Sequence, residues 1–143
     1  MNSEFAICVH ALVYLDHKAA CLSSEELAEN ICTNAARIRK VLGKLKKAGI
    51  LSTKEGIGGG YQVEKDIRDI TLGDLCKILD VEPVKATWKS GSLDMECMVA
   101  SGMSTVMDDI YGKMNELCGD YLNTISVFDI SHKIFMPKPK QNG

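Results

Sequence analysis

The sequence predicts a mainly α-helical chain that carries one small β-hairpin and a long C-terminal helix. Three observations lead to this fold class. Apolar residues recur at helical spacing in most segments, a glycine cluster separates two short strand-like runs, and an amphipathic pattern continues over residues 99–125. Because 143 residues with 45% hydrophobic content can bury one core, we expect one domain with an appended helix.

The first predicted helix covers residues 3–17. Its apolar residues occupy much of the helix circumference, which is typical of a helix that packs against more than one neighbour. The preceding residues lack a basic n-region, and no apolar run in the chain approaches the ~18 residues of a membrane span. We therefore expect no signal peptide, no contact with a membrane and a cytoplasmic location.

Two further helices are predicted on either side of a short turn. The first begins at Ser23 and ends near Cys32. Thr33 is the predicted N-cap of the second, which runs over residues 35–48 and ends before Gly49, a residue that tolerates a left-handed conformation. Two helices joined by so short a turn are typical of a helix-turn-helix.

The second of these helices has an apolar face and a cationic face. Ile38, Leu42 and Leu45 form an inward stripe, and basic residues recur on another side. From Thr33 to Lys54 there are seven basic residues and no acidic one, so the rest of the chain, with ten basic and 19 acidic residues, carries −9. A solvated helix face is the ordinary interpretation of such charges. The flanking segments favour the alternative, which is nucleic-acid binding.

A hairpin is predicted after the cationic helix, with strands at residues 50–53 and 61–63. The loop between them, residues 54–60, is rich in glycine. Such a cluster can imitate a phosphate-binding loop, but neither a Lys-Ser/Thr pair nor a helix follows it, which argues against nucleotide binding. The order helix, helix, hairpin is that of a winged helix-turn-helix, with the hairpin as the wing.

A fourth helix and an irregular connector follow the wing. Thr71 is the predicted N-cap of this helix, with Asp74 at the capping-box position. Helical periodicity is lost over residues 81–98, where proline, glycine and serine indicate a connector that could serve as a sensing loop. We thus expect a winged helix-turn-helix domain at residues 1–80. Trp88 lies in the connector, where we expect it to fill the junction between the domain and the long helix.

The long helix carries two apolar rows, which indicate two packing partners. One partner is the chain's own domain, and the other is the same helix of a second subunit in a twofold homodimer. The alternative is a helix packed wholly within a monomer, but the chain offers little else to cover it. Residues 99–132 form the predicted dimerisation helix and closing segment, and residues 133–143 a flexible tail. The rows are Val99, Met103, Val106, Ile110, Met114, Leu117 and Tyr121, and Met107, Tyr111, Met114, Cys118, Leu122 and Ile125.

Three segments, KVLGKLKKAGIL, GGGY and DITLGDLCKILD, resemble the Rrf2 family of bacterial winged-helix transcription regulators. The resemblance covers roughly residues 1–130 and is most specific from Lys40 to Asp80. It implies a homodimeric, cytoplasmic DNA-binding regulator, usually a repressor, and not an enzyme. The two recognition helices of such a dimer would read the half-sites of a palindromic operator on double-stranded DNA. The family commonly has an arginine just before the first wing glycine, where this chain has Glu55.

The predicted DNA interface divides its residues between two roles. The start of the cationic helix would read base edges in the major groove, with Arg37 the best candidate for a guanine. Later basic residues and the wing amides would hold phosphates, which supply affinity and salt dependence without sequence information. The base-reading candidates are Thr33, Asn34, Ala35, Arg37 and Lys40, and the phosphate-binding candidates are Arg39, Lys44, Lys46, Lys47, Lys54, Gly58, Gly59 and Gly60. Arg39 and Lys40 can exchange roles.

Six cysteines in a cytoplasmic protein are expected to be reduced thiols. Cys32 precedes the cationic helix, whose dipole and arginines would favour its thiolate, whereas acidic neighbours would keep Cys97 protonated. The predicted redox switch is oxidation of Cys32 and a disulfide with Cys97 of the same or the other subunit. The alternative is that both are inert small residues.

Other controls and functions remain as alternatives. Cluster-binding members of the family have three cysteines in the connector, where this chain has Cys97 alone, so we expect no metal, iron-sulfur cluster or other cofactor. A small effector could bind at the domain junction near Trp88, Met95, Met98 and Met103, although methionines also fill ordinary cores. A thiol enzyme lacks an evident base, and seven cations argue against a protein-binding adaptor.

Overall fold

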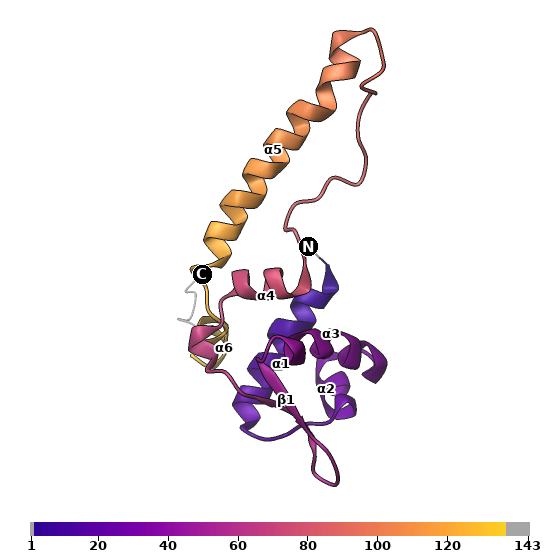
Figure 1. The fold of residues 1–143 in the computed structure, drawn as a ribbon. Helices are drawn as coiled ribbons and strands as arrows, with labels where there is room; N and C mark the ends of the chain where they lie inside the picture. The colour runs from indigo at the N-terminus through magenta and orange to yellow at the C-terminus, as the bar shows by residue number, and fades with distance from the viewer. Residues whose placement is uncertain (1, 137–143) are drawn as a thin grey trace, which may run out of the picture.

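A computed structural model describes residues 2–136 of the chain, which form a helical body and one projecting helix (Figure 1). The described part confirms the mainly α-helical class with one hairpin. No helix in it is long and apolar enough to cross a bilayer. The elements are α1 (Ser3–Lys18), α2 (Ser24–Ile31), α3 (Ala35–Lys47), β1 (Leu51–Lys54), β2 (Gly60–Val63), the 3-10 turn η1 (Ile67–Asp69), α4 (Leu72–Leu79), α5 (Met98–Leu122) and α6 (Val127–Phe135).

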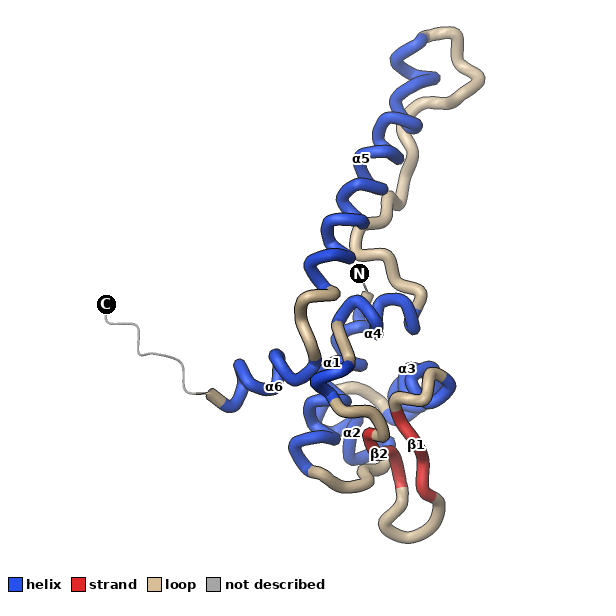
Figure 2. Tube along the Cα trace, turned by 60° about the vertical axis from the view of Figure 1, so that its left-hand side comes forward, coloured by secondary structure: helices blue, strands red, loops and turns tan. Residues whose placement is uncertain are grey.

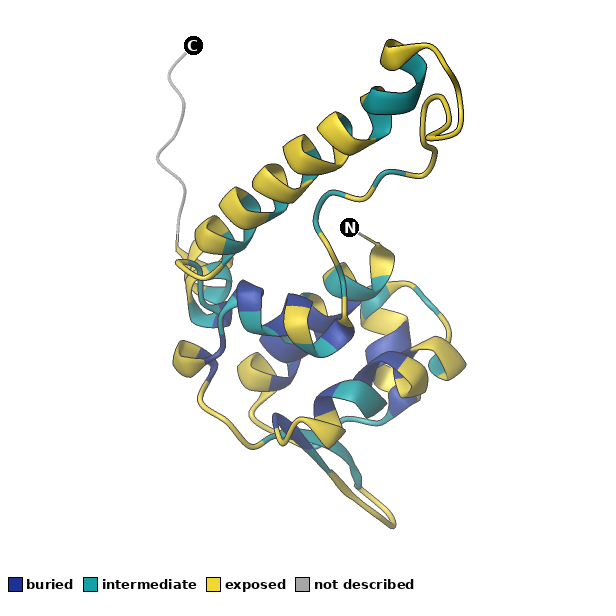
Figure 3. Cartoon of the chain, turned by 45° about the horizontal axis from the view of Figure 1, so that its top comes forward, coloured by how far each residue is buried: buried dark blue, intermediate teal, exposed yellow. Residues whose placement is uncertain are grey.

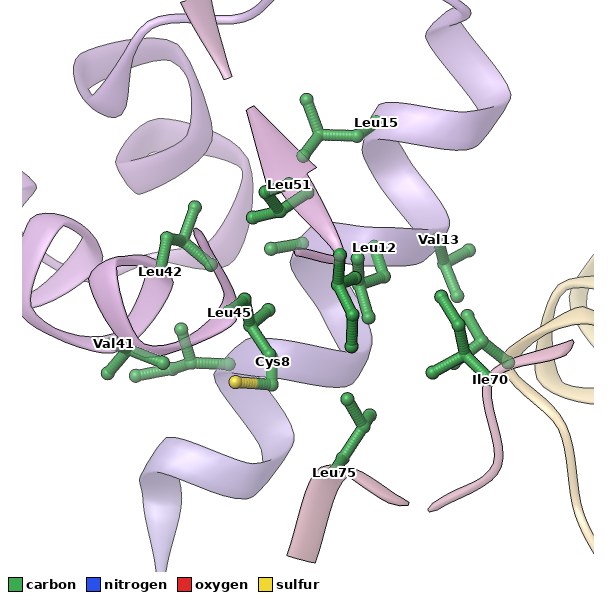
Figure 4. Packing of buried hydrophobic residues seen from close by; sticks show 14 of the residues in the cluster. Cys8, Leu12, Val13, Leu15, Val41, Leu42, Leu45, Leu51, Ile70 and Leu75 are labelled. Carbon is green, nitrogen blue, oxygen red and sulfur yellow. The ribbon is translucent and has the colours of Figure 1, made fainter. Parts of the chain in front are cut away.

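The core is built around α1, which runs through the middle of the body. Cys8 and Leu12 are fully buried and face Leu45 of α3 and Leu75 of α4 (Figure 4). Since α1 contacts α2, α3, α4, α6 and β2, its apolar residues need to cover most of its circumference, as the sequence predicts. Each large apolar side chain buried here contributes about 1.5–3 kcal/mol to folding.

The helix-turn-helix differs from the prediction by one residue. The N-cap of α3 is Asn34 and not Thr33, because the Asn34 side-chain oxygen accepts the Arg37 N–H over 2.8 Å. Both residue types cap helices, and the Thr33 N–H instead completes the end of α2 by donating to the Ala28 carbonyl over 3.0 Å. Gly49 has φ +79°, the left-handed conformation expected at the end of this helix.

The wing is an antiparallel hairpin that is attached to the segment preceding α2. β1 and β2 pair in a register that places Leu51 opposite Val63. The backbone of Tyr61 exchanges two hydrogen bonds with Leu22, over 2.8 and 3.0 Å. Gly60 has φ +144°, and a Cβ atom there would lie 2.2 Å from the Leu22 carbonyl oxygen. These contacts hold the base of the wing beside α2.

The end of the chain folds back onto the body. The Leu72 N–H donates to the Ile125 carbonyl and the Val127 N–H to the Ile70 carbonyl, each over 2.8 Å, which joins the starts of α4 and α6. The predicted tail at residues 133–143 begins too early, because α6 continues to Phe135, whose ring stacks on His17 at 4.3 Å. The part of that tail from residue 137 onward lies outside the described residues.

Helix α5 leaves the body and carries the connector along one side (Figures 1 and 2). It begins at Met98 and ends at Leu122, three residues before the predicted end, because Asn123 caps it and Ser126 starts α6. None of its residues is buried (Figure 3). The first predicted apolar row is exposed along its length, whereas the second is half-buried apart from Met114, which the rows share.

Trp88 does not fill the domain junction. Its side chain is 77% exposed and lies on the connector beside Met107 and Tyr111, in a shallow hollow of about 320 Å³ on α5. The prediction was wrong because the connector does not turn back into the body: it follows α5 outward to its far end (Figure 1).

Candidate nucleic-acid interface

Helix α3 presents a cationic face because its other face supplies the core. Ile38, Val41, Leu42 and Leu45 are fully buried, as their helical spacing requires. The basic side chains are therefore confined to the opposite sides of the helix, where they are exposed or half-buried. The wing, which carries Lys54 and Glu55, extends from the same region of the body (Figure 1), so it lies beside the basic helix on the surface.

The base-reading candidates lie at the start of α3. Arg37 is exposed, and its guanidinium donates a hydrogen bond to the Ser3 hydroxyl of α1. Asn34 is also exposed, but its side-chain oxygen is engaged as the N-cap. Thr33 and Ala35 are half-buried, and Ala35 packs against the core. Among these four residues, Arg37 carries the positive charge.

Two lysines of α3 meet one carboxylate from α1. The Lys44 ammonium lies 3.0 Å from one oxygen of Glu4, and the Lys40 ammonium lies 3.7 Å from the other. The hydrogen bond from Lys44 lowers the pKa of the Glu4 carboxyl; burial opposes this shift, and the charges of both lysines add to it. Lys40 and Lys44, which the sequence predicts as DNA contacts, are thus paired with a carboxylate of the protein itself.

Arg39 is paired in a similar way with α2. Its guanidinium lies 3.6 Å from the Glu25 carboxylate and donates to the Ser24 hydroxyl over 3.1 Å. The backbone N–H of Glu25 at the start of α2 lowers the pKa of its own carboxyl, and the Ser24 hydroxyl shifts it in the same direction. Burial opposes this shift, and the charge of Arg39 adds to it. Both side chains of this ion pair are more than half exposed, so solvent screens it strongly.

The remaining cations lie toward the wing. The Lys46 ammonium donates to the Thr53 hydroxyl over 2.8 Å, which joins the end of α3 to β1. Lys47 and Lys54 are exposed and form no ion pair with another described residue. They are the cations of this surface with the least competition from the protein itself.

The wing amides are not equally available to phosphates. The Gly59 N–H donates to the Gly56 carbonyl over 3.1 Å within the wing turn, and Gly60 pairs with Lys54 across the hairpin. Gly58 is exposed and has φ +75°. Ile57 at the tip is also completely exposed. Of the three predicted amides, that of Gly59 is thus engaged within the turn, and a phosphate contact of the wing stays a prediction.

Sequence reasoning missed three residues of this surface: Ser3, Glu4 and Glu25. All three come from elements that precede α3, and they reach its cations only through the packing of α1 and α2 against it. Nothing in their local pattern indicates this role. A first turn rich in serine and glutamate predicts a helix start, but it does not identify the neighbouring helix.

The helix ends next to Cys32 and Cys97 differ from the prediction, which placed Cys32 beside a helix N-terminus. Cys32 is the C-cap of α2, and its exposed thiol faces the Glu29 carbonyl at 3.8 Å, so it lies at a carbonyl end of a helix. Cys97 is the exposed N-cap of α5, where the N–H groups of Ala100 and Val99 lower the pKa of its thiol, against a small effect of burial. The surroundings of Cys97 thus favour its thiolate, which is the reactive form of a cysteine.

A disulfide between these two residues within one subunit does not fit the structure. Cys32 lies in the body, whereas Cys97 lies at the outer end of the 25-residue helix α5, which is about 37 Å long (Figures 1 and 2). A disulfide requires Cα atoms within about 7 Å. This part of the predicted switch is wrong, because the connector extends away from the body.

The residues of the connector do not fit an iron-sulfur cluster. Cys97 supplies one thiolate, and the next cysteine along the chain, Cys118, lies about six turns further along α5. Among residues 2–136 there is no group of three His, Cys, Asp or Glu side chains close enough together to hold a metal ion. Soft thiolate ligands in one place are what such a cluster needs.

Two of the four predicted effector residues line one hollow, which lies on α5 and not at the domain junction. Trp88 and Met103 line the hollow of about 320 Å³ on α5, whereas Met95 and Met98 are exposed near its outer end and do not line it. An apolar hollow of about 480 Å³ lies instead between α1 and α6, and we call it the α1/α6 hollow. Its lining includes Phe5, Val9, His10, Val13, Tyr14, His17, Leu72, Ile130, Ile134 and Phe135.

A helix-turn-helix followed by a hairpin wing, with a basic second helix, defines a winged-helix transcription regulator that binds DNA. The sequence profile of the Rrf2 family, described as iron-dependent transcriptional regulators, matches residues 1–133. The chain belongs to the Rrf2 family, which is not a family of enzymes.

Individual relatives agree with this assignment. YwnA of Bacillus subtilis, named as an HTH-type transcriptional regulator, is 26% identical over 144 residues, covering 94% of this chain and 99% of YwnA. The HTH-type transcriptional regulator IscR of Escherichia coli is 24% identical over 134 residues, covering 91% of this chain and 83% of IscR. A crystal structure of a transcriptional regulator from Lactobacillus plantarum is 27% identical, with a TM-score of 0.78 over 94% of this chain and 91% of the other.

Proposed function

We propose that the protein is a homodimeric repressor that binds a palindromic operator, with one α3 in the major groove of each half-site. The observation that carries this proposal is the exposed cationic face of α3 next to the wing. Basic helices of this kind bind phosphates at every sequence and gain specificity from base contacts. A dimer bound across a promoter would compete with polymerase for the same DNA, and its site of action is the cytoplasm.

Within the proposed complex, the cations of α3 have different roles. Arg37 reads a guanine, because a guanidinium can donate two parallel hydrogen bonds to the major-groove edge of this base. Lys47 and Lys54 hold phosphates, since no acidic residue competes for them. Arg39, Lys40 and Lys44 exchange their partners in the protein, Glu25 and Glu4, for DNA.

The dimer of this proposal forms through the exposed row on α5. Seven large apolar side chains, from Val99 to Tyr121, lie on one side of the helix and are 38% to 67% exposed. The connector occupies another side of α5, where Lys89 pairs with Asp108 at 3.1 Å. An exposed apolar row of this length indicates an interface. Two copies of the row can pack against each other about a twofold axis.

The proposal includes control of DNA binding by oxidation. Cys97 is the thiol that reacts with the oxidant. Its thiolate would attack a hydroperoxide, giving a sulfenic acid and an alcohol or water. The thiol of Cys32 of the partner subunit could then form the disulfide and release water. The lowered pKa and exposure of Cys97 support the first step.

An apolar effector is the second candidate for control. The α1/α6 hollow has the volume of an ordinary small-ligand site, and its walls are almost wholly apolar. A ligand there would contact α1, which also carries Ser3 and Glu4 beside α3. Binding could thus be coupled to the recognition helix through one rigid element.

The test is DNA binding by the purified protein at several salt concentrations. Genomic fragments, including the region upstream of its own gene, are used in a mobility-shift assay with reduced and peroxide-treated protein. Tight binding of a few fragments, falling steeply with salt, supports the proposal. Absence of binding to every fragment contradicts it. A response to peroxide that Cys97→Ser abolishes supports control by oxidation, and an unchanged response assigns control elsewhere.

A further inference from the structure

Among the described residues, Glu4 forms the shortest ion pair with the basic face of α3. Its two carboxylate oxygens face two different lysines, Lys44 at 3.0 Å and Lys40 at 3.7 Å. The neighbouring Ser3 accepts a hydrogen bond from Arg37. One turn of α1 therefore engages three cations that are candidates for contact with DNA.

The position of Glu4 is set by α1 and not by the lysines. The Asn2 side chain accepts the Glu4 N–H over 3.1 Å, so Glu4 lies in the first turn of a capped helix, where the helix dipole favours a carboxylate. Its side chain is only 15% exposed, whereas those of Lys44 and Lys40 are 38% and 72% exposed. The carboxylate is held at the protein surface, and the lysines can move away from it.

A phosphate that binds either lysine has to displace this carboxylate. The three side chains together carry a net charge of +1 instead of the +2 that the two lysines alone would carry. Each phosphate neutralised by a protein cation contributes about −0.9 to the slope of log affinity against log salt concentration. A cation already neutralised by Glu4 releases fewer counterions from DNA when it binds.

We propose that Glu4 competes with DNA phosphates for Lys40 and Lys44 and thereby limits the affinity and the salt dependence of DNA binding. This inference rests on the proposed function, because it assigns a role to Glu4 in the same interface. It differs from a purely structural role for the ion pairs, under which loss of the carboxylate would weaken binding.

The test compares Glu4→Gln with wild-type protein on one operator fragment and one random fragment of equal length. Affinity is measured by fluorescence anisotropy between ~50 and ~300 mM salt. Glu96→Gln is the matched control, since it removes the same charge from the connector at the far end of α5. Glu4→Ala, which removes the carboxylate without adding an amide, guards against an effect particular to glutamine. Circular dichroism checks that all variants are folded.

We expect Glu4→Gln and Glu4→Ala to bind both fragments about three- to tenfold more tightly near 0.1 M salt, with a slope steeper by up to about 0.9. Glu96→Gln should match the wild type. Affinity and slope equal to those of the wild type, or weaker binding by a folded Glu4→Gln variant, would overturn the inference while leaving the proposed function intact. Absence of salt-dependent DNA binding by the wild type would overturn the proposed function itself.

Discussion

The side chain of Asn115 on α5 forms two hydrogen bonds with the backbone of Val84 in the connector. Its amide donates to the Val84 carbonyl and its oxygen accepts the Val84 N–H, each over 2.7 Å. With the Lys89–Asp108 ion pair, this contact holds the connector on a side of α5 away from the exposed apolar row. The row is thereby left open to a second subunit.

Asn115→Ala should release the connector, because it leaves both polar groups of Val84 without their partner. Hydrogen exchange measured by mass spectrometry should show faster exchange of the Val84 amide and its neighbours, and limited proteolysis should cut residues 81–97 sooner. Glu116→Ala, one position further on the exposed surface of α5, is the control. Unchanged exchange at Val84 would show that the connector is held by other contacts.

Val106→Glu should prevent dimer formation, since it places a charge in the middle of the apolar row. The side chain is 55% exposed in the isolated chain, so the substitution should leave the fold of the monomer intact. Size-exclusion chromatography with light scattering should show a monomer, and operator affinity should fall at least tenfold. Thr105→Glu is the control, because it adds the same charge at the adjacent exposed position on the far side of α5. If both variants remain dimeric, the row is not the interface.

Two glycine substitutions should have opposite effects on stability. Gly60→Ala should destabilise the protein by about 1–3 kcal/mol, because its Cβ would lie 2.2 Å from the Leu22 carbonyl oxygen at the base of the wing. Gly43→Ala, inside α3 with no neighbouring atom within 4 Å of the new Cβ, should stabilise it by up to about 1 kcal/mol. Thermal denaturation measures both. A neutral Gly60→Ala would contradict the close contact between wing and body.

The cysteines should differ widely in reactivity. Burial raises the pKa of Cys8 to about 12, whereas helix N–H groups lower that of the exposed Cys97. Iodoacetamide near pH 8, followed by mass spectrometry, should modify Cys97 early and Cys8 only after unfolding. Rapid labelling of Cys8 in the folded protein would contradict its burial.

The raised pKa of Cys8 predicts the direction in which the stability of the protein changes at alkaline pH. In the unfolded chain this thiol loses its proton near pH 9, but the folded protein retains it to about 12. Its contribution to stability is therefore complete below pH 9 and declines as the pH rises. Denaturant titrations of the wild type and Cys8→Ala should converge toward high pH. A difference that grows with pH would contradict this sign.

Local patterns predicted the elements better than the contacts between them. The burial of Leu42 and Leu45 follows from helical spacing, and the hairpin follows from a glycine-rich loop between two short runs. The N-cap was misplaced by one residue, because Thr33 and Asn34 are both capping types. Glu4 could not be predicted as a partner of Lys44, since the pairing depends on tertiary packing across 40 positions of sequence.

The prediction for the surroundings of Cys32 and Cys97 was wrong for a related reason. A thiol next to a helix start in the sequence can also lie at the end of the preceding helix, as Cys32 does. The sequence likewise does not indicate whether a connector without periodicity folds back or extends. Here it extends, and Cys97 lies at the outer end of α5.

In the proposed complex, α3 reads sequence through Arg37 and binds phosphate through Lys47. The direct measurement is the affinity of Arg37→Ala and Lys47→Ala for an operator and a series of single-base variants at fixed salt. Arg37→Ala should lose about 1–3 kcal/mol of discrimination at one base pair in each half-site. Lys47→Ala should weaken every sequence equally and reduce the salt slope by about 0.9. If Arg37→Ala instead weakens all sequences equally, Arg37 does not read a base, and the recognition proposed for α3 is contradicted.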